Sequence, residues 1–300
     1  MKRDISAQYR LEGFGYHIVE KLVGSLPDNT LPQVARFFAF LAFTVLRIRR
    51  RVSLENLNIA FPEKSLSWKK QIAYYSYLHF SLVILEFMKM NSWNANQLER
   101  HVYRASVGNV MDALRHGEGA IVVSGHFGNW EIGIGHYFFL GVASTVIQQR
   151  QKNPLINDKM KALREKWGME IVYPRGAVRN CAKALKRGRL VAILGDQDAG
   201  DKGVFVPFFG RLSSTHIGAA VLQIKTGVRI FLGRVVRINT GKFDIDMIEI
   251  PNPERHKLKQ HNVRSLTAEL MSVLEREIRK KPAQYFWMHR RWKTPPPQEK

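Results

Sequence analysis

Cysteine, acidic residues and long apolar runs are all scarce in this sequence of 300 residues. The one cysteine, Cys181, excludes an intramolecular disulfide and fits a reducing compartment. Its neighbours Ala182 and Leu185 suggest a packed helix, and no paired base is visible, so we assign Cys181 no catalytic role. No run reaches the ~20 apolar residues that a spanning helix needs. The charged first residues are not followed by the short apolar core of a cleavable signal peptide.

Acidic residues are outnumbered by basic ones, 25 against 47, which gives a net charge of +22. A hydrophobic content of 45% with 24% charged residues is typical of a folded globular protein and excludes a disordered one. The excess of positive charge therefore indicates an anionic partner: nucleic acid, an anionic membrane, or an acidic protein or lipid.

An apolar stretch at residues 37–46 contains several aromatic side chains and lies between Arg36 and the basic cluster of residues 47–51. It is too short to span a bilayer. An apolar helix beside a basic cluster is typical of a segment that lies in the interface of a cytoplasmic leaflet. An ordinary buried helix with a charged end is the alternative. We favour the membrane interpretation, because an apolar helix next to a basic cluster is less common than a basic cluster alone.

The order of helical and strand patterns predicts an α/β fold, with a mixed, partly parallel central sheet covered by helices. A helical, membrane-associating region is expected over residues 1–100, including a helix at 67–90 with apolar residues at helical intervals. The α/β catalytic region is expected over residues 101–300 as one continuous domain. The predicted strands are 119–124, 144–149, 170–173, 189–195, 228–238 and 242–250. The predicted helices are 130–140, 154–167, 177–187, 215–226 and about 261–281.

Local signals support these boundaries. Gly168, Gly188 and Gly227 lie where glycines end helices. Thr215 has the side chain of a helix N-cap. The segment Asn239-Thr240-Gly241 predicts an antiparallel hairpin between the last two strands.

The clearest chemical signal is Ser-Gly-His-Phe-Gly-Asn-Trp-Glu at residues 124–131, directly after the apolar run 120–123. The glycines and Asn129 predict a turn that presents His126 between a buried strand and a helix. At about 100° per residue, two side chains five residues apart on one helix point about 140° apart. His126 and Glu131 therefore meet only if His126 lies in the turn and Glu131 in the first helical turns. A neutral imidazole held by a carboxylate is a good general base for a hydroxyl nucleophile.

Two other interpretations of this segment stay open. In one, His126 is a loop histidine with its hydrogen bonds satisfied and Glu131 is a solvated helix residue. In the other, His136 joins them as a metal ligand. Ligands on one helix usually lie three or four residues apart, and His136 is five beyond Glu131. We favour acid–base chemistry and expect neither a metal nor a cofactor.

Arg164 and Asp196 are also candidates for the site. Asp196 ends a strongly apolar strand, and ligands of open α/β sheets bind beyond the carboxyl ends of the strands. Asp196 is expected to support Arg164, whose cation would stabilise a developing oxyanion. A plain surface arginine is the alternative. Asp196 and Asp198 also resemble the acidic pair of many glycosyltransferases, which leaves a metal-dependent glycosyltransferase as an alternative function.

Two further segments contain candidate substrate contacts. Residues 205–210 form a dense apolar loop past the predicted catalytic edge, which favours an acyl channel over core packing. Residues 285–293 interleave aromatic side chains with cations, which suits a membrane interface or nucleic-acid stacking, and its paired arginines suit phosphate. The predicted substrate-binding residues are Asn129, Phe205, Pro207, Phe208, Thr215, Arg290 and Arg291.

Residues 125–131, 195–210 and 286–293 together resemble the bacterial lipid A late acyltransferases, which are lauroyl and myristoyl transferases of the lysophospholipid acyltransferase superfamily. The stretch from the arginine cluster to Ala60-Phe61-Pro62-Glu63 is similar to them too, so the resemblance covers nearly the whole chain. It implies an enzyme at the cytoplasmic face of the inner membrane. Such an enzyme moves a fatty acyl group from acyl carrier protein to a hydroxyl on an acyl chain of a lipid A precursor.

The resemblance also implies residue roles. His126 would be the base, Glu131 its orienting partner, and Arg164 and Asp196 further members of the site. Backbone amides of the glycine turn, together with Arg164, would hold the oxyanion. The thiolate leaves easily, so no metal is needed.

The partners that fit the positive charge are an acidic carrier protein, the phosphates of an anionic glycolipid and an anionic bilayer. Relatives with this motif acylate mannosylated phosphoinositides, so that acceptor, with acyl-CoA as the donor, is an alternative. A basic nucleic-acid-binding protein is an alternative from another class. We rank it lower and expect no nucleic acid, because the sequence contains no glycine–aromatic RNA motif and no helix-turn-helix pattern.

Overall fold

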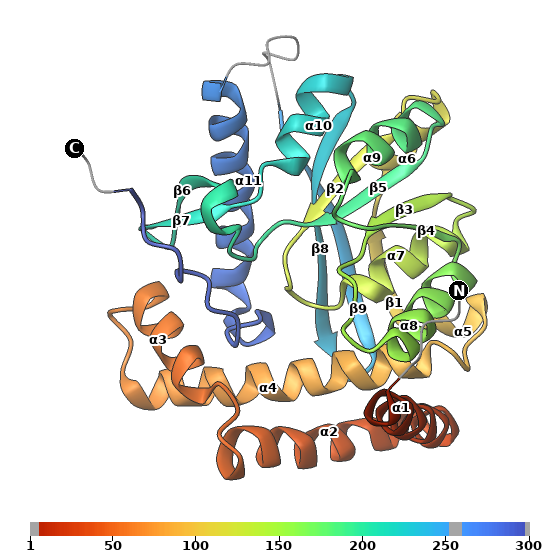
Figure 1. The fold of residues 1–300 in the computed structure, drawn as a ribbon, viewed down its shortest axis with the longest axis vertical. Coiled ribbons are helices and arrows are strands. Elements are labelled where there is room, and N and C mark those ends of the chain that lie inside the picture. Colours follow the sequence, from red (N-terminus) through yellow and green to blue (C-terminus); the bar gives the residue numbers. More distant parts are fainter. Residues whose placement is uncertain (1–5, 252–259, 298–300) are drawn as a thin grey trace.

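A seven-stranded sheet forms the centre of the molecule (Figure 1). The computed structural model describes residues 6–251 and 260–297. The strand order is β1-β9-β8-β2-β5-β3-β4, in which the five strands from β8 to β4 are mutually parallel. β9 pairs antiparallel with β8 and parallel with β1. The strands of this sheet are β1 (Val102–Ser106), β2 (Ala120–Ser124), β3 (Ser144–Ile147), β4 (Met169–Val172), β5 (Leu190–Leu194), β8 (Arg229–Asn239) and β9 (Lys242–Glu249).

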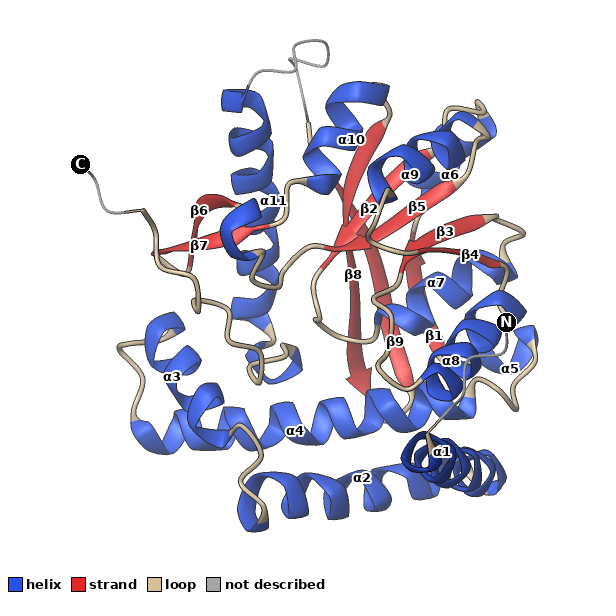
Figure 2. Ribbon diagram, viewed as in Figure 1, coloured by secondary structure: helices blue, strands red, loops and turns tan. Residues whose placement is uncertain are grey.

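Helices cover both faces of the sheet (Figure 2). α6 and α7 enclose one apolar core against the sheet, and α9, α10 and α11 enclose the other. A separate antiparallel pair, β6 (Val204–Phe208) and β7 (Arg211–Thr215), packs on α11. The helices of this part are α6 (Gly108–Arg115), α7 (Trp130–Phe139), α8 (Pro154–Lys166), α9 (Ala177–Lys186), α10 (Gly218–Thr226) and α11 (Gln260–Lys280), with 3-10 turns at Gly200–Lys202 and Pro282–Gln284.

The N-terminal part is helical, as predicted. The long helix α4 passes the carboxyl end of β8, and α1 and α2 pack against α4 (Figure 1). Ser65 begins α4 because its side chain accepts a hydrogen bond from the Trp68 amide. The elements are α1 (Ala7–Ser25), a 3-10 turn (Asp28–Thr30), α2 (Leu31–Phe40), a π-helical turn (Leu41–Val45), α3 (Arg50–Ala60), α4 (Leu66–Lys89) and α5 (Ala95–Glu99).

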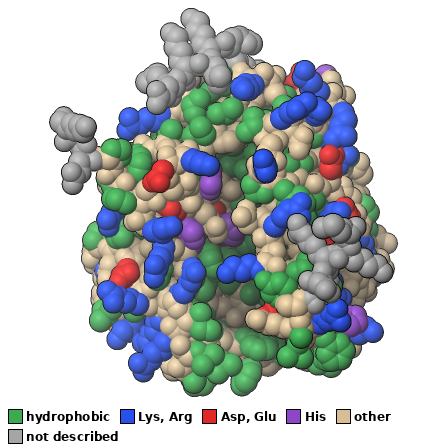
Figure 3. All heavy atoms as spheres, viewed as in Figure 1, with side chains coloured by type: hydrophobic (Ala, Val, Ile, Leu, Met, Phe, Trp, Pro, Cys, Tyr) green, Lys and Arg blue, Asp and Glu red, His purple; other side chains and the backbone are tan. Residues whose placement is uncertain are grey.

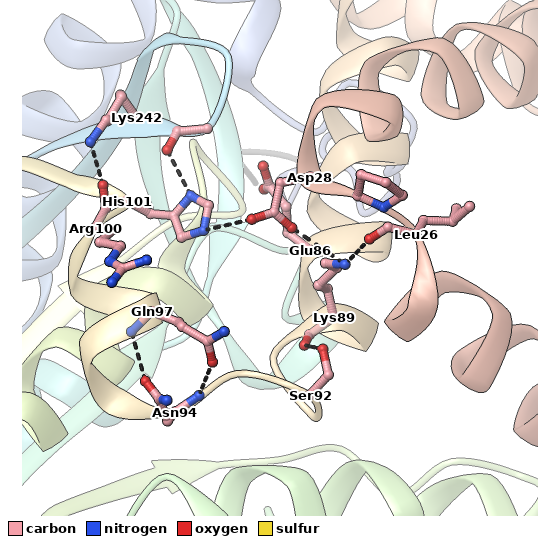
Figure 4. Close-up of polar contacts among 12 residues, drawn as sticks. Leu26, Asp28, Glu86, Lys89, Ser92, Asn94, Gln97, Arg100, His101 and Lys242 are labelled. Atoms are coloured by element: carbon pink, nitrogen blue, oxygen red, sulfur yellow. Dashed lines mark hydrogen bonds and ion pairs between the residues drawn. The ribbon is translucent and has the colours of Figure 1, made fainter.

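Polar contacts tie these helices to the sheet (Figure 4). The Asp28 carboxylate lies 3.4 Å from Lys89 Nζ and 3.9 Å from His101 Nε2. Lys89 also donates to the Leu26 carbonyl oxygen. The other ring nitrogen of His101, Nδ1, lies 2.7 Å from the carbonyl oxygen of Gly241, in the turn between β8 and β9. The loop after α1 is thereby joined to the edge of the sheet.

The mixed α/β architecture confirms the predicted fold class, and the predicted strands and helices occur within a few residues of their expected limits. Gly168, Gly188 and Gly227 have positive φ at helix ends, as expected. One local prediction was wrong. Thr215 ends β7 instead of capping a helix, so α10 begins at Gly218. The short elements β1, α6, β6 and β7 were not predicted.

The apolar stretch 37–46 lies in α2 and the π-helical turn. Within the described residues, no single helix is long and apolar enough to cross a bilayer. The segment Asp28–Val45 and the helix Arg50–Ala60 pass that test only as a pair, by length and composition, and are bent 89° to each other.

Candidate active site

The predicted strand–turn–helix is present at His126. β2 ends at Ser124, and α7 begins after Asn129, whose side-chain oxygen accepts a hydrogen bond from the Ile132 amide. Gly128 has a φ of +64°, and a Cβ there would lie 1.8 Å from the carbonyl oxygen of Val235. Only glycine fits such a position. The turn therefore holds His126 at the carboxyl end of the parallel strands.

Asp196 is the carboxylate that contacts His126. β2 and β5 are parallel neighbours with Ser124 opposite Leu194, so residues that follow the two strand ends come together. His126 Nδ1 lies 2.8 Å from Asp196 Oδ1. Burial raises the pKa of the Asp196 carboxyl, but the charge and hydrogen bonds of His126 outweigh burial and hold that pKa below its usual value. Asp196 is thus ionised and accepts the Nδ1 proton, which leaves Nε2 as the basic nitrogen.

The predicted orientation of His126 by Glu131 needs correction. Glu131 lies in the first turn of α7, and its carboxylate accepts hydrogen bonds from Arg164 at 2.5 Å and from the indole of Trp130 at 3.0 Å. The helix directs Glu131 toward α8, while the imidazole is directed toward the end of β5. Asp196 therefore makes the contact that was expected of Glu131.

Arg164 is held in place by two partners. Besides Glu131 it donates to the side-chain oxygen of Gln148 at 2.6 Å. Burial lowers the pKa of the Arg164 guanidinium, but the Glu131 carboxylate raises this pKa by more than burial lowers it, so the net shift is upward. The expectation that Asp196 supports Arg164 was wrong, since Asp196 is bonded to His126. Arg164 remains a fixed cation that lines the same cleft as His126.

Two cavities meet beside His126. A cleft of about 560 Å³ is lined by His126, Arg164 and Gln197 at the sheet edge and by apolar residues of α9, α10 and α11. A smaller cavity of about 90 Å³ lies between α7 and the sheet, and its lining includes Glu131, Tyr137 and Ala192. Both cavities share Trp130 and Arg164 as walls. Figure 3 shows histidine side chains near the centre of a hollowed face, with Lys and Arg side chains around them.

Buried polar contacts support the turn that contains His126. The Asn129 amide group donates to Glu86 of α4 at 2.7 Å, and Glu86 forms a two-fold ion pair with Arg237 of β8 at 2.6 Å. The backbone N–H groups of Gly128 and Asn129 donate to the carbonyl oxygens of Gln284 and Val235. These two amides are therefore not available to an oxyanion, contrary to the sequence-based expectation. Asn129 is fully buried and supports the turn instead of contacting substrate.

His79 of α4 supports the same turn and makes stability depend on pH. Its Nε2 lies 3.0 Å from the Gly128 carbonyl oxygen, and burial, with the charge of Arg237, lowers the pKa of His79 from 6.5 to about 3. Below pH 6.5 the unfolded chain takes up a proton that the folded chain refuses, so the free energy of unfolding falls as pH falls.

Between pH 6.5 and 5, His79 should lower the free energy of unfolding of the wild-type protein by up to about 2 kcal/mol. His79→Gln keeps a donor for the Gly128 carbonyl oxygen but does not titrate, so we expect it to lose up to about 2 kcal/mol less over this range. Urea unfolding of both proteins at pH 7 and pH 5 measures this difference. Equal losses in the two proteins would contradict it.

The C-terminal segment lies behind Asp196, where it changes the roles predicted for two residues. Arg291 is buried and donates to the Ser214 carbonyl oxygen at 2.5 Å and to the Thr215 hydroxyl at 2.6 Å. Both Arg291 and Thr215 are inaccessible to a substrate, so neither binds phosphate or lipid as predicted. Arg290 lines a different, basic groove beside α3.

The segment 205–210 does not line the cleft. It forms β6 and the turn after it, and Phe208 is buried with the Arg291 guanidinium 5.2 Å above its ring. Pro207 is exposed, and neither Phe205 nor Phe208 lines either cavity at the catalytic edge. The alternation of strand residues buries one side of this segment, which an apolar composition alone does not reveal.

The sequence matches the model of the bacterial lipid A biosynthesis acyltransferases across residues 2–294. This chain belongs to that family. The lipid A biosynthesis palmitoleoyltransferase of Escherichia coli (strain K12) is 25% identical over 292 residues, 96% of this chain and 93% of that protein. The lipid A biosynthesis lauroyltransferase of the same strain is 25% identical over 281 residues, 92% of this chain and 89% of that protein. The phosphatidylinositol mannoside acyltransferase of Mycobacterium tuberculosis (strain ATCC 25618 / H37Rv) is 26% identical over 151 residues, 48% of each chain.

The resemblance expected from the sequence is thus confirmed, and this member of the lipid A biosynthesis acyltransferase family is an acyltransferase. The two acidic residues that follow β5, Asp196 and Asp198, are not arranged as the metal-binding pair of a glycosyltransferase. Asp196 is bonded to His126, whereas Asp198 accepts hydrogen bonds from Thr294. His136 pairs with Glu99 at 2.7 Å. Among the described residues, no three His, Cys, Asp or Glu side chains are grouped as metal ligands.

Two residues beside His126 in this candidate site were not predicted from the sequence. Gln197 Nε2 lies 3.4 Å from His126 Nε2, and Trp130 packs edge-on to the imidazole with ring centroids 5.0 Å apart. Their proximity in sequence to Asp196 and Glu131 was the available signal. Tyr285 lies behind Asp196, and burial raises the pKa of its phenol well above the usual value.

Proposed function

We propose that this acyltransferase moves a fatty acyl group from the thioester of an acyl carrier protein to a hydroxyl of a lipid A precursor or a related glycolipid. The supporting observation is the His126–Asp196 pair where two largely apolar cavities meet. Relatives that match nearly the whole chain are named palmitoleoyltransferase and lauroyltransferase of lipid A biosynthesis. A base between two apolar cavities suits a reaction in which the donor and the acceptor both carry acyl chains.

In the proposed reaction, Nε2 of His126 takes the proton of the acceptor hydroxyl as its oxygen attacks the thioester carbonyl carbon. The new carbon–oxygen bond gives a tetrahedral intermediate with a negative oxygen, which the fixed cation of Arg164 stabilises. The carbon–sulfur bond then breaks, and the leaving thiolate takes the proton from the imidazolium. Asp196 holds the tautomer in which Nε2 is unprotonated and stabilises the imidazolium, which makes Asp196 a positioning residue.

The N-terminal helices offer the surface for membrane attachment. Large apolar side chains are exposed on α1, on α2 and in the turn after it, and hydrophobic side chains gather along the lower edge of Figure 3. They include Leu11, Phe14, Leu22, Phe37, Phe38, Val45 and Leu46. An exposed apolar face bordered by cations suits insertion into the interface of an anionic leaflet.

The basic groove beside α3 suits the phosphates of an anionic glycolipid. It has a volume of about 1020 Å³ and gathers the cations of residues 47–51 with Arg211, Arg290 and Lys293, against the single acid Glu55. The C-terminal segment is fixed there because the Asn56 amide donates to the carbonyl oxygens of Trp287 and His289. The groove adjoins exposed Val45, Leu46 and Ile48, so a headgroup bound in it would lie at the level of the membrane surface.

The alternative acceptor is a mannosylated phosphoinositide, with acyl-CoA as the donor. The match over 151 residues to a phosphatidylinositol mannoside acyltransferase favours it. To choose between the two, the purified enzyme is given labelled acyl carrier protein or acyl-CoA with each lipid, and mass spectrometry identifies the product. Acylation of the phosphoinositide alone would refute the lipid A assignment.

The cavity between α7 and the sheet is proposed to receive the transferred acyl chain. Ala192 lies on the central strand β5 yet is only half-buried, because its methyl group borders this cavity. Ala192→Leu should therefore shorten the preferred acyl chain, since each methylene that no longer fits forfeits about 0.8 kcal/mol of burial. Competition between donors of different chain length measures the preference.

Ala219→Leu is the matched control, because Ala219 lines only the larger cleft. An unchanged preference in Ala192→Leu, with a shift in Ala219→Leu, would assign the acyl chain to the larger cleft.

A further inference from the structure

A second basic groove lies beside the mouth of the catalytic cleft, and the proposed mechanism does not use it. This α9 groove has a volume of about 930 Å³ and contains four cations, Arg150, Arg175, Lys183 and Arg187. Glu170 is its one carboxylate, and it is paired with Arg187 at 2.6 Å and with Arg189 at 3.4 Å. The groove therefore presents a net positive charge to an approaching partner.

The α9 groove and the catalytic cleft share a rim. Gln149 and Gln151 line the cleft, and Arg150 between them lines the groove. Pro174 likewise lines the cleft, next to Arg175 of the groove. A partner bound in the groove would thus lie within reach of the cleft that contains His126.

The cations are displayed on a rigid surface. Asn180 and Lys183 lie three residues apart on the outer face of α9, and Arg187 follows the last residue of the helix. The opposite face of α9 is buried and includes Cys181 and Leu185. Arg150 is stacked over the Tyr173 ring, with 3.8 Å between the guanidinium carbon and the ring centroid. These cations lie on several elements, over an area suited to a macromolecule more than to a single phosphate.

The surroundings of the α9 groove distinguish it from the groove beside α3. The large apolar side chains exposed in the described residues lie mainly on the N-terminal helices, and none falls between residues 141 and 211. In Figure 1, α9 lies at the upper right, whereas α1 and α2 lie along the bottom. A cationic surface remote from the apolar face suits a soluble acidic partner rather than a bilayer.

We propose that the α9 groove is the docking surface for the acidic carrier protein that delivers the acyl thioester. The inference rests on the proposed carrier-bound donor. Acidic side chains of the carrier pair with the cations of the groove, and the thioester at the end of the carrier's arm enters the adjoining cleft. Such charge pairing chiefly raises the rate of encounter and depends on salt.

The test is a charge reversal at Arg175 and Lys183, whose exposed side chains make no hydrogen bond or ion pair within the described part of the chain. Arg175→Glu/Lys183→Glu should lower kcat/KM for the acyl carrier protein by at least about tenfold, because charge steering contributes 10–10³-fold to association. The same variant should use a neutral acyl-pantetheine donor within about twofold of the wild-type rate, since that donor lacks the acidic surface. Added salt should reduce the difference from wild type.

Lys225→Glu/Arg276→Glu is the matched control, because it makes the same change in charge on exposed helix faces outside the described cavities. Equal carrier kinetics in the two double variants would overturn the docking proposal and leave the proposed function intact. Equal losses with carrier and with acyl-pantetheine would also overturn it, because the groove would then act on the thioester itself. A wild-type enzyme that does not prefer carrier protein to acyl-pantetheine would instead refute the carrier as donor, and docking with it.

Discussion

Replacement of His126 by alanine should slow acyl transfer by about 10²–10⁴-fold, because the acceptor hydroxyl then loses its general base. The His126 side chain lines the cleft and contacts Asp196 at 2.8 Å and Gln197 at 3.4 Å, so its removal should leave the fold intact. The rate is measured with a thioester donor and a glycolipid acceptor in mixed micelles, and circular dichroism at rising temperature reports the fold.

Free imidazole provides a control for this variant. Since truncation of His126 opens space in the cleft, added imidazole should restore part of the lost rate by taking the hydroxyl proton. A folded His126→Ala enzyme that transfers acyl groups at the wild-type rate would rule out base catalysis by His126.

Asp196→Asn should also slow transfer, by about 10²–10⁴-fold, while the overall structure is retained. The amide that replaces the carboxylate presents its N–H to Nδ1 of His126, which forces the proton onto Nε2 and blocks the base. The variant is nearly the same size, and Asp196 is buried, so no new space is created. The pH profile of kcat/KM should lose the limb that wild type owes to the imidazole.

The variant Glu131→Gln distinguishes the role of the Glu131 carboxylate from that of Asp196. Glu131 neutralises the buried end of Arg164, and loss of one partner of a buried ion pair typically costs 3–5 kcal/mol of folding stability. Glu131→Gln should therefore lower the melting temperature more than Asp196→Asn does and keep the imidazole limb of the pH profile. If Glu131→Gln removed that limb and Asp196→Asn did not, the assignment of partners would be reversed.

Much of the fold followed from periodicity. The run 120–123 is buried on both faces, as expected of a strand within a parallel sheet. The short strand β1 lies at the sheet edge with all of its residues exposed or half-buried, so its sequence lacks the apolar signal of a buried strand. Residues 205–210 were misjudged because their apolar side chains face the core on one side of a hairpin rather than a channel.

The four candidate catalytic residues lie close together, but their hydrogen-bond partners differ from those predicted. His126, Glu131, Arg164 and Asp196 all lie at one edge of the sheet, as expected from strand ends. Which carboxylate meets the imidazole depends on the parallel register of β2 and β5, a long-range property that local spacing does not contain. The assignment of Arg291 failed for a similar reason, because its burial depends on contacts with β7, which is distant in the sequence.

The most direct test of the account is a double-mutant cycle on the acyl-transfer rate with His126→Ala and Asp196→Asn. Because Asp196 acts through the imidazole, the double variant should be no slower than His126→Ala alone, so the two effects should be far from additive. A double variant slowed by the product of both single effects would show that the aspartate works independently of the histidine, and would contradict the proposed mechanism.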